Sequence, residues 1–487
     1  MRPGIKLLSE ELVGRILEEA FHLLGQVGVK VHLREARQLL AAAGAMVDES
    51  ADVVRIPENV AREALAAAPR QFDLFNLAGE ASVHYGGDVV QFDPGSSGVN
   101  VLDPLTLEHR PARTEDLIKV VKVAEMLTAY DAQSTALVCS EVPKEIGDLY
   151  RLYLVLLLSA KPIITGAFSI STTSAMVEML AIFAGGASAL ASRPRAVFDV
   201  CPSPPLLWSD FGAQNLLDLA RAAVPVEIVS MPLAGAAGPV TLLGCVVQHA
   251  AECLSGITIH QLARPGSPIV WGGAPAIMDM RHGTTPMGAI ETAMIDAAYA
   301  EVGKHLGLPT HTYLGASDSK LLDAQAGLES GISALMGALA GINMISGAGM
   351  LDFLACLSPE KLVLDAEAIG MARRLLEGMK VHTDTLALSM FEGFAFKGEF
   401  LRQKITRQLF REEQFLPSEV IDRGSIRAWD QEGRKDTMAR AHARVEHLLG
   451  AYQPPELPLE RVRELVQLVK RLAMAAGMDR LPFEPKA

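Results

Sequence analysis

The stretch from Glu227 to Trp271 decides the fold: EIVSMPLAGAAGPVTLLGCVVQHAAECLSGITIHQLARPGSPIVW. It begins with a short apolar run and continues through a glycine-rich loop into a long apolar helical segment. It ends in a second short apolar run, Ile269–Trp271. A strand, a helix and a second strand in this order predict a parallel βαβ unit, in which the helix crosses over between neighbouring strands.

The same unit repeats along the chain. Eight apolar runs rich in β-branched residues are predicted strands: Val89–Phe92, Ser134–Val138, Ile163–Phe168, Val197–Val200, Glu227–Met231, Ile269–Trp271, His311–Leu314 and Met344–Ser346. They alternate with eight predicted helices near 115–127, 145–159, 173–184, 211–223, 240–263, 288–306, 323–340 and 359–378. This α/β pattern predicts a closed (β/α)8 TIM barrel; an open doubly wound sheet also alternates, but the count of eight favours the barrel.

Helical segments flank the predicted barrel on both sides. We expect an N-terminal helical extension over 1–80, the barrel catalytic domain over 81–385 and a C-terminal helical extension over 386–487. Inside the barrel, the apolar run Ala334–Leu351 is interrupted by Asn343, Ser346 and several glycines. Such interruptions predict a buried helix, a turn and a buried strand rather than a membrane span.

Composition narrows the class of protein. The 487 residues include 44 Lys and Arg against 57 Asp and Glu, a net charge of −13, which argues against a nucleic-acid partner. Five cysteines without a CxxC pair and a charged N-terminus without a secretory core predict a reducing, cytoplasmic location. Cys139 and Cys201 both follow predicted strands, but free cysteines usually pack as small core hydrophobes, so no metal site is predicted.

Aromatic and acidic residues gather where the predicted strands end. In a barrel of this kind the active site lies at the carboxyl ends of the strands. The candidates there are Phe92, Asp93, Trp271, Tyr313, Asp318 and Phe353. Aromatic faces with nearby carboxylates bind quaternary ammonium groups through cation–π and apolar contacts, although such residues also occur in ordinary barrel cores.

Five linked motifs resemble one protein family. They are Phe92-Asp93-Pro94-Gly95, the loop Met231–Pro239, Trp271-Gly272-Gly273-Ala274-Pro275, the segment Ser317–Lys320 with Asp323–Gly327, and Ser346-Gly347-Ala348-Gly349. Together they resemble the trimethylamine methyltransferase superfamily over nearly the whole chain. The resemblance implies the same barrel fold and transfer of a methyl group from a methylated amine to the Co(I) of a separate corrinoid protein. It therefore implies a corrinoid cofactor carried by a partner protein.

The resemblance also implies a substrate class. The trimethylamine enzymes carry pyrrolysine near the loop that corresponds to Tyr313–Asp318, where this chain has only standard residues. Members without pyrrolysine include glycine betaine demethylases. A quaternary ammonium already carries a neutral amine as its leaving group, so Co(I) can displace it in line without a proton donor. A quaternary or other methylated amine is thus the implied small-molecule substrate.

We assign roles to the candidate residues on this basis. Asp318 and Tyr313 are expected to be catalytic. The expected substrate-binding residues are Phe92, Asp93, Trp271, Arg281, His282, Lys320 and Phe353, of which Arg281, His282 and Lys320 are candidates for binding a substrate carboxylate. Where the family often has His-Phe-Leu followed by His-Thr, this chain has Glu399-Phe400-Leu401 and Ile405-Thr406. That departure points to a substrate that differs from glycine betaine or to a different subgroup.

Two alternatives remain open from the sequence. One is a barrel lyase or decarboxylase of a small acid, which would need no corrinoid protein. The other is a non-catalytic protein that binds a quaternary amine. Apolar helices in an acidic barrel also suggest a homo-oligomer without a membrane partner.

Overall fold

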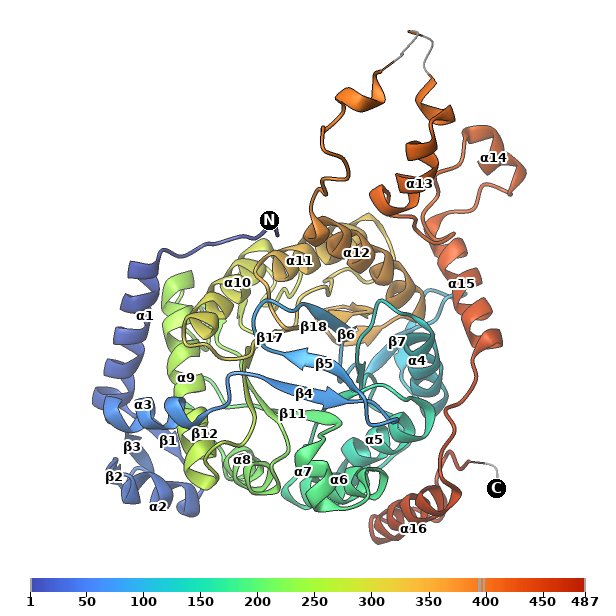
Figure 1. Ribbon diagram of the computed structural model, residues 1–487. Helices are drawn as coiled ribbons and strands as arrows, with labels where there is room; N and C mark the ends of the chain where they lie inside the picture. Colours follow the sequence, from blue (N-terminus) through green and yellow to red (C-terminus); the bar gives the residue numbers. More distant parts are fainter. Residues whose placement is uncertain (1, 393–395, 397–398, 486–487) are drawn as a thin grey trace.

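A closed barrel of eight parallel strands forms the centre of the computed structural model, which describes residues 2–392, 396 and 399–485 (Figure 1). The barrel strands are β6 (Gln91–Pro94), β9 (Gln133–Ser134), β10 (Ile163–Gly166), β11 (Ala196–Val200), β13 (Val226–Ser230), β15 (Ile269–Gly273), β17 (His311–Thr312) and β18 (Met344–Ala348). Each predicted strand is present within a few residues of its expected place.

The strands pair in chain order and close on themselves. One ladder has the order β15-β13-β11-β10-β9 and the other β17-β18-β6. A parallel bridge between Trp271 and Thr310 joins β15 to β17. At the other junction, the Asp131 amide donates to the Phe92 carbonyl at 2.8 Å and joins β9 to β6. The predicted barrel is therefore confirmed, and the open sheet is excluded.

Eight helices surround the barrel, as the alternation predicted (Figure 1). They are α4 (Thr114–Met126), α5 (Gly147–Leu158), α6 (Ile170–Ala184), α8 (Asp210–Ala222), α9 (Leu242–Ala263), α10 (Ile290–His305), α11 (Ala324–Leu339) and α12 (Pro359–Glu377), with a short α7 (Ala187–Ser192) after α6. The apolar run 334–351 is the end of α11, a turn and β18, which confirms the sequence interpretation.

Helix α9 is the helix of the described chain that is long and apolar enough to cross a membrane. However, 78% of its apolar window is buried inside the protein. Its neighbours α1 (Glu10–His22), α3 (Glu58–Ala67), α8 and α10 pack around it. Contacts with these helices explain its mostly apolar composition, which is typical of a core helix.

The N-terminal extension contains a small sheet as well as the predicted helices. After α1 come a π-helical turn η1 (Leu23–Val27) and α2 (Arg34–Ala42). Strands β1 (Val29–Val31), β3 (Val53–Arg55) and β2 (Met46–Asp48) form an antiparallel ladder that β1 extends in parallel to β12 (Leu207–Trp208). The helical description was incomplete because three-residue strands are too short to show a periodicity.

A hairpin closes the amino-terminal end of the barrel. Strands β4 (Phe72–Phe75) and β5 (Ala81–Tyr85) pair in antiparallel fashion. Their side chains Leu74, Val83 and Tyr85 pack on the first inward-facing residues of the barrel strands, which are Ala132, Ile164, Val197, Val270 and Met344. Residue 80, the expected domain boundary, lies in the turn of this hairpin.

Short strands line the opposite end. A four-stranded sheet combines β7 (Asn100–Leu102), β8 (His109–Pro111), β19 (Met350–Leu351) and β20 (Cys356–Leu357) in the order β19-β20-β7-β8. Strands β14 (Leu233–Ala234) and β16 (Ala276–Ile277) form a separate parallel pair. These segments follow the carboxyl ends of β6, β13, β15 and β18, and they restrict access to the barrel mouth.

The C-terminal part leaves the barrel and returns to it. Figure 1 shows the chain after α12 projecting outward through the region of α13 (Lys404–Glu413) and α14 (Ile426–Gln431). The single-turn helices η3 (Leu388–Met390) and η4 (Glu399–Arg402) also lie in this projection, and η2 (Lys144–Ile146) precedes α5. Helix α15 (Thr437–Ala451) then packs on α4 and α12, and α16 (Leu459–Ala475) packs on α5 and α6.

Candidate active site

A cavity of about 180 Å³ lies at the carboxyl ends of the barrel strands. Its lining comes from segments that follow different strands: Ser96, Ser97, Gly166, Ala167, Phe168, Asp199, Val200, Cys201, Phe211, Asn215, Val229, Met231, Ala274, Tyr313 and Leu354. Most of these side chains are apolar or small. Phe168 and Met231 are 54% and 39% exposed, so a small molecule reaches the cavity from solvent.

Asp199 is the acidic residue of this lining. Its Oδ2 accepts a hydrogen bond of 2.7 Å from the Tyr313 hydroxyl, and the carboxyl group also interacts with the carboxyl group of Glu227. Burial, with the nearby Glu227 carboxyl group as a second cause, raises the pKa of Asp199 well above its usual range. A raised pKa favours the neutral form of the carboxyl group, whereas a cation beside it favours the ionised form.

A chain of buried polar side chains crosses the barrel interior. His311 Nε2 lies 2.6 Å from Ser346 Oγ, and Ser346 Oγ donates to Asp93 Oδ1. On the other side of the ring, His311 Nδ1 contacts Glu227 Oε2. Burial raises the pKa of Glu227 and lowers the pKa of His311 to about 4, so the imidazole is neutral.

One arrangement of protons satisfies this chain. A protonated Glu227 donates to His311 Nδ1, and the Nε2–H of His311 donates to Ser346. The Ser346 hydroxyl then donates to Asp93. Gly272 makes room for the first member, because a Cβ at position 272 would overlap the Glu227 carboxyl group. The barrel interior thus places a hydrogen-bonded chain of buried acidic, imidazole and hydroxyl groups below a mostly apolar cavity.

Arg151 lies behind another wall of the cavity. Its Nη1 donates to Ser97 Oγ at 3.2 Å and to the Thr135 carbonyl at 2.9 Å. Its guanidinium carbon lies 4.9 Å from the centre of the Phe168 ring. Burial lowers the pKa of Arg151 to about 10, so the group remains charged at neutral pH. The cavity therefore has an acid on one wall and a cation behind Ser97 and Phe168.

The structure places two of the expected aromatic residues outside the cavity. Trp271 is fully buried, donates its indole N–H to the Tyr299 carbonyl at 3.0 Å and packs edge-on against His249. The Phe92 ring packs beneath Arg373, whose guanidinium carbon lies 5.6 Å from the ring centre. Alternation along a strand explains both positions, since the inward-facing neighbours are Gly272 beside Trp271 and Asp93 beside Phe92.

Tyr313 lines the cavity, and Asp318 and Phe353 lie in loops beside it. Asp318 Oδ1 accepts hydrogen bonds from the Met287 and Gly288 amides at 2.8 and 3.0 Å, and burial raises the pKa of Asp318 to about 6. Its carboxylate thus holds the loop after β15 in place and does not line the cavity.

Lys320 and Phe353 belong to a cluster that shapes the mouth. Lys320 Nζ lies 3.9 Å above the Phe353 ring and 3.4 Å from Asp352 Oδ1. Asp352, Phe353 and Leu354 have φ values of 49°, 57° and 70°, a left-handed turn that is unusual without glycine. This turn brings Leu354 into the cavity wall, so the cluster acts on the cavity through backbone shape.

Arg281 and His282 lie on an exposed loop after β15. Arg281 makes a two-point ion pair with Asp279, with an Nη2–Oδ2 distance of 2.6 Å, and His282 Nδ1 lies 3.5 Å from the same carboxylate. Their side chains are 81% and 70% exposed. The structure therefore does not bring this pair to the cavity, and Arg151 is the cation placed there instead.

Metal chemistry finds little support in the described part of the chain. Residues 2–392, 396 and 399–485 contain no group of three or more His, Cys, Asp or Glu side chains arranged around a common point. Cys201 lines the cavity, but Cys139 does not. Burial raises the pKa of both thiols, to about 12 for Cys139. Both therefore remain protonated, as expected of packed cysteines.

The fold and the cavity define the class of protein as a closed parallel (β/α)8 barrel with a small, mostly apolar cavity at the carboxyl ends of its strands. Comparison with known proteins is more specific. Residues 1–477 match the family described as trimethylamine methyltransferase (MTTB). The chain belongs to this family.

Curated relatives cover almost the whole chain. The trimethylamine methyltransferase MttB of Desulfitobacterium hafniense (strain DSM 10664 / DCB-2) is 28% identical over 98% of this chain and 96% of its own. A Methanosarcina thermophila protein of the same name is 30% identical over 95% and 96%. The glycine betaine methyltransferase of D. hafniense (strain Y51) is 30% identical over 98% and 99%.

Solved structures share the fold at low identity. The monomethylamine methyltransferase MtmB of Methanosarcina barkeri superposes with a TM-score of 0.53 at 13% identity, over 92% of this chain and 89% of that chain. A hydroxylamine complex of MtmB gives a TM-score of 0.54 at 12% identity over the same shares. These similarities agree with the barrel described above.

Proposed function

We propose that this protein transfers a methyl group from a quaternary ammonium compound to the Co(I) of a partner corrinoid protein, in the cytoplasm. The observation that carries the proposal is the cavity itself, which joins apolar walls to the Asp199 carboxyl group. A methylated ammonium ion has no N–H to donate, so it is recognised by apolar contact and by charge rather than by hydrogen bonds. The lining supplies both.

Asp199 and Tyr313 are the residues that we propose for the cation. The Tyr313 hydroxyl donates to Asp199 Oδ2 and so fixes the carboxyl group in the cavity wall, where it lies beside a bound ammonium. Tyr313 keeps its proton because burial raises its pKa well above the usual range. The pair therefore orients the substrate, and neither residue needs to give up a proton during transfer.

The site residues proposed for a substrate carboxylate are Ser97 and Arg151. Their side chains meet at 3.2 Å, and Ser97 is part of the cavity wall. Arg151 Nε and Nη2 are buried without a partner among the described residues, so the guanidinium retains donors for an anion. A cation end at Asp199 and an anion end near Ser97 match a zwitterionic betaine better than a simple alkylamine.

The corrinoid supplies Co(I), which accepts the methyl group as the leaving amine departs. The residues present fit such an acceptor, since Phe168 and Met231 at the rim are exposed and the substrate methyl is reachable from outside. The apolar wall excludes water around the ammonium, and the small cavity limits its orientations. The protein's contribution is then binding, orientation and electrostatics.

Self-association is part of the proposal. Val381, Leu386 and Leu388, in the segment after α12, are 75%, 82% and 71% exposed. Apolar side chains on a projecting segment are typical of an interface between subunits. Light scattering of the purified protein in solution tests this, and a mass equal to a single chain at all concentrations would contradict it.

The experiment that tests the function mixes the protein with reduced Co(I) corrinoid protein and a panel of methylated amines. The panel includes glycine betaine, carnitine, choline, tetramethylammonium and trimethylamine. Conversion of Co(I) to methyl-Co(III), followed by absorbance, with one quaternary compound supports the proposal and identifies the donor. Binding of a quaternary compound without methyl transfer would instead support the non-catalytic binding protein, and turnover of a small acid without corrinoid would support a lyase.

A further inference from the structure

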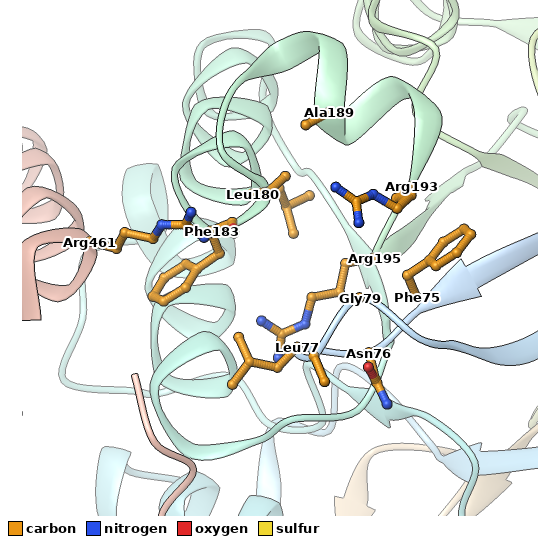
Figure 2. Close-up of a pocket in the computed structure, with 12 residues that line it drawn as sticks. Phe75, Asn76, Leu77, Gly79, Leu180, Phe183, Ala189, Arg193, Arg195 and Arg461 are labelled. Carbon is orange, nitrogen blue, oxygen red and sulfur yellow. Dashed lines mark hydrogen bonds between the residues drawn. The ribbon is translucent and has the colours of Figure 1, made fainter. Parts of the chain in front are cut away.

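A second pocket, of about 210 Å³, lies at the opposite end of the barrel from the candidate active site. It is formed by the turn of the β4–β5 hairpin, helices α6 and α7, the residues just before β11, and helix α16 (Figure 2). The residues that line it are Phe75, Asn76, Leu77, Ala78, Gly79, Leu180, Phe183, Ala184, Ala189, Arg193, Arg195 and Arg461. Neither the proposed methyl transfer nor the substrate cavity uses any of them.

Three arginines are the charged residues of this pocket. Figure 2 shows Arg193 and Arg195 on the segment that leads into β11, with Arg461 entering from α16 on the other side of Phe183. No Asp or Glu occurs among the lining residues, all of which belong to the described chain. The protein as a whole carries a net charge of −13, whereas the lining of this pocket carries three positive charges.

Arg195 is the buried cation of this pocket. The residue is 6% exposed, and its Nη2 donates to the Ser159 carbonyl at 2.6 Å. Its Nη1 is buried and has no hydrogen-bond partner among the described residues. Leaving a charged donor buried and unpaired costs on the order of 1–3 kcal/mol or more, which an anion in the pocket would offset.

Carboxylates near Arg195 do not fill this role. Glu125 is the acidic group that acts on it electrostatically, but the Glu125 oxygens accept hydrogen bonds from Ser159 Oγ at 2.5 Å and from the Ala160 amide at 3.0 Å. Arg461 Nη1 donates to the Phe183 carbonyl. Arg193 has no hydrogen bond or ion pair from its guanidinium to any described residue. Arg193 and Arg461 therefore keep guanidinium donors that no described residue uses, and Arg195 Nη1 lies unpaired in the wall of the pocket.

The rest of the lining specifies the kind of anion. Phe75, Leu77, Leu180 and Phe183 give the pocket an apolar side next to the cations. Its volume equals about seven water molecules at ~30 Å³ each, well below that of a nucleotide site. Guanidinium groups bind carboxylate and phosphate oxygens through paired N–H donors.

We infer that the pocket bounded by Arg193, Arg195 and Arg461 is a binding site for a small organic anion that bears a phosphate or carboxylate on an apolar group. The site is separate from the substrate cavity and stands whether or not the proposed methyl transfer is correct. Arg195 directly precedes β11, and Asp199 is four residues further along the same strand. At ~3.3 Å per residue the two sites lie about 13 Å apart along the backbone.

Calorimetry on the full-length protein tests the inference. The probes are phenyl phosphate, benzoate and neutral benzamide, so that the phosphate and carboxylate arms are measured separately. We expect saturable binding of at least one anionic probe and none of benzamide. Arg193→Gln and Arg461→Gln should each weaken that binding about tenfold or more, because each removes a charged hydrogen-bond donor. Both positions are partly exposed, so both variants are expected to fold.

Arg463→Gln is the matched control. Arg463 is an exposed arginine two residues further along α16, on the face turned away from Arg461. Its substitution should leave the affinity unchanged. The inference is overturned if neither anionic probe binds at concentrations up to about 10 mM, a limit that corresponds to a very weak site. It is also overturned if the two pocket variants bind as the unchanged protein does, with thermal melts showing all three variants folded.

Discussion

Replacing Asp199 by asparagine removes the negative charge of the substrate cavity with almost no change in shape. The Tyr313 hydroxyl lies 2.7 Å from Oδ2, and it can donate to the amide oxygen of asparagine in the same way. Asp199 also interacts with the Glu227 carboxyl group, and an asparagine amide can hydrogen-bond to that group as well. The barrel should therefore keep its fold while the cavity loses its charge.

The size of the effect follows from the geometry. A quaternary nitrogen at roughly 5 Å from the carboxylate, with an effective dielectric constant of about 20, gains ~3 kcal/mol. Part of this is spent on ionising Asp199, whose pKa is raised by burial in the empty cavity. A net loss of about 2 kcal/mol remains, which corresponds to roughly 30-fold weaker binding.

Calorimetry with two ligands separates charge from shape. Glycine betaine carries the quaternary nitrogen, and 3,3-dimethylbutyrate has carbon in its place with the same carboxylate. In Asp199→Asn we expect betaine to bind about 30-fold more weakly and the carbon analogue to bind equally or more tightly.

Asp296→Asn is the control for this experiment. Asp296 is fully buried and accepts one hydrogen bond, from Thr312 at 2.8 Å, and it lies outside the cavity. It should leave both affinities unchanged. An undiminished affinity for betaine in a folded Asp199→Asn protein, or an equal loss for both ligands, would refute the reasoning.

Three further predictions concern pH and the barrel interior. Because the pKa of Asp199 is raised in the empty cavity and a cation lowers it, binding of a quaternary amine should release a proton and weaken as pH falls. Calorimetry in buffers of different ionisation enthalpy measures the proton release, and identical binding heats in all buffers would contradict the prediction. Gly272→Ala forces a Cβ into the Glu227 carboxyl group and should lower the free energy of unfolding by about 1–3 kcal/mol in urea, whereas Gly147→Ala, with open space around its Cβ, should not. Lys361→Met removes the ammonium group that lies 2.6 Å from the buried Asp365 carboxylate, and it should lower the free energy of unfolding in urea by about 3–5 kcal/mol. Replacing both residues by apolar ones should recover most of that loss. A single variant as stable as the unchanged protein would show that the pair is not charged.

Much of the fold was accessible from the chain because its signals are local. Each strand and helix around the barrel has its own apolar run and its own boundaries, and the count of eight units selects a closed barrel. In the small N-terminal sheet, the apolar run Val53–Ile56 predicts a short strand and corresponds to β3, whereas β1 and β2 were missed because three residues show no periodicity. The hairpin β4–β5 was missed because its apolar side chains are buried only by packing on the barrel strands, which are distant in sequence.

The candidate site was predicted less well, and strand alternation explains why. The prediction selected Phe92 and Trp271 from their positions near strand ends, but both face outward. Asp199 and Glu227 were overlooked, although each lies within a predicted strand. The signal was present, since Asp199 follows the interior Val197 by two residues and therefore faces the same way.

The sequence by itself determined the order and type of the barrel elements and the family to which the chain belongs, because these depend on short-range patterns and on linked motifs. Tertiary structure alone decided which charged groups meet. Arg461 reaches Phe183 across 278 residues of chain, and Leu354 enters the cavity through a left-handed turn that no periodicity encodes. The physical reason is that burial, pKa and free hydrogen-bond donors depend on packing between distant segments, which local sequence does not contain.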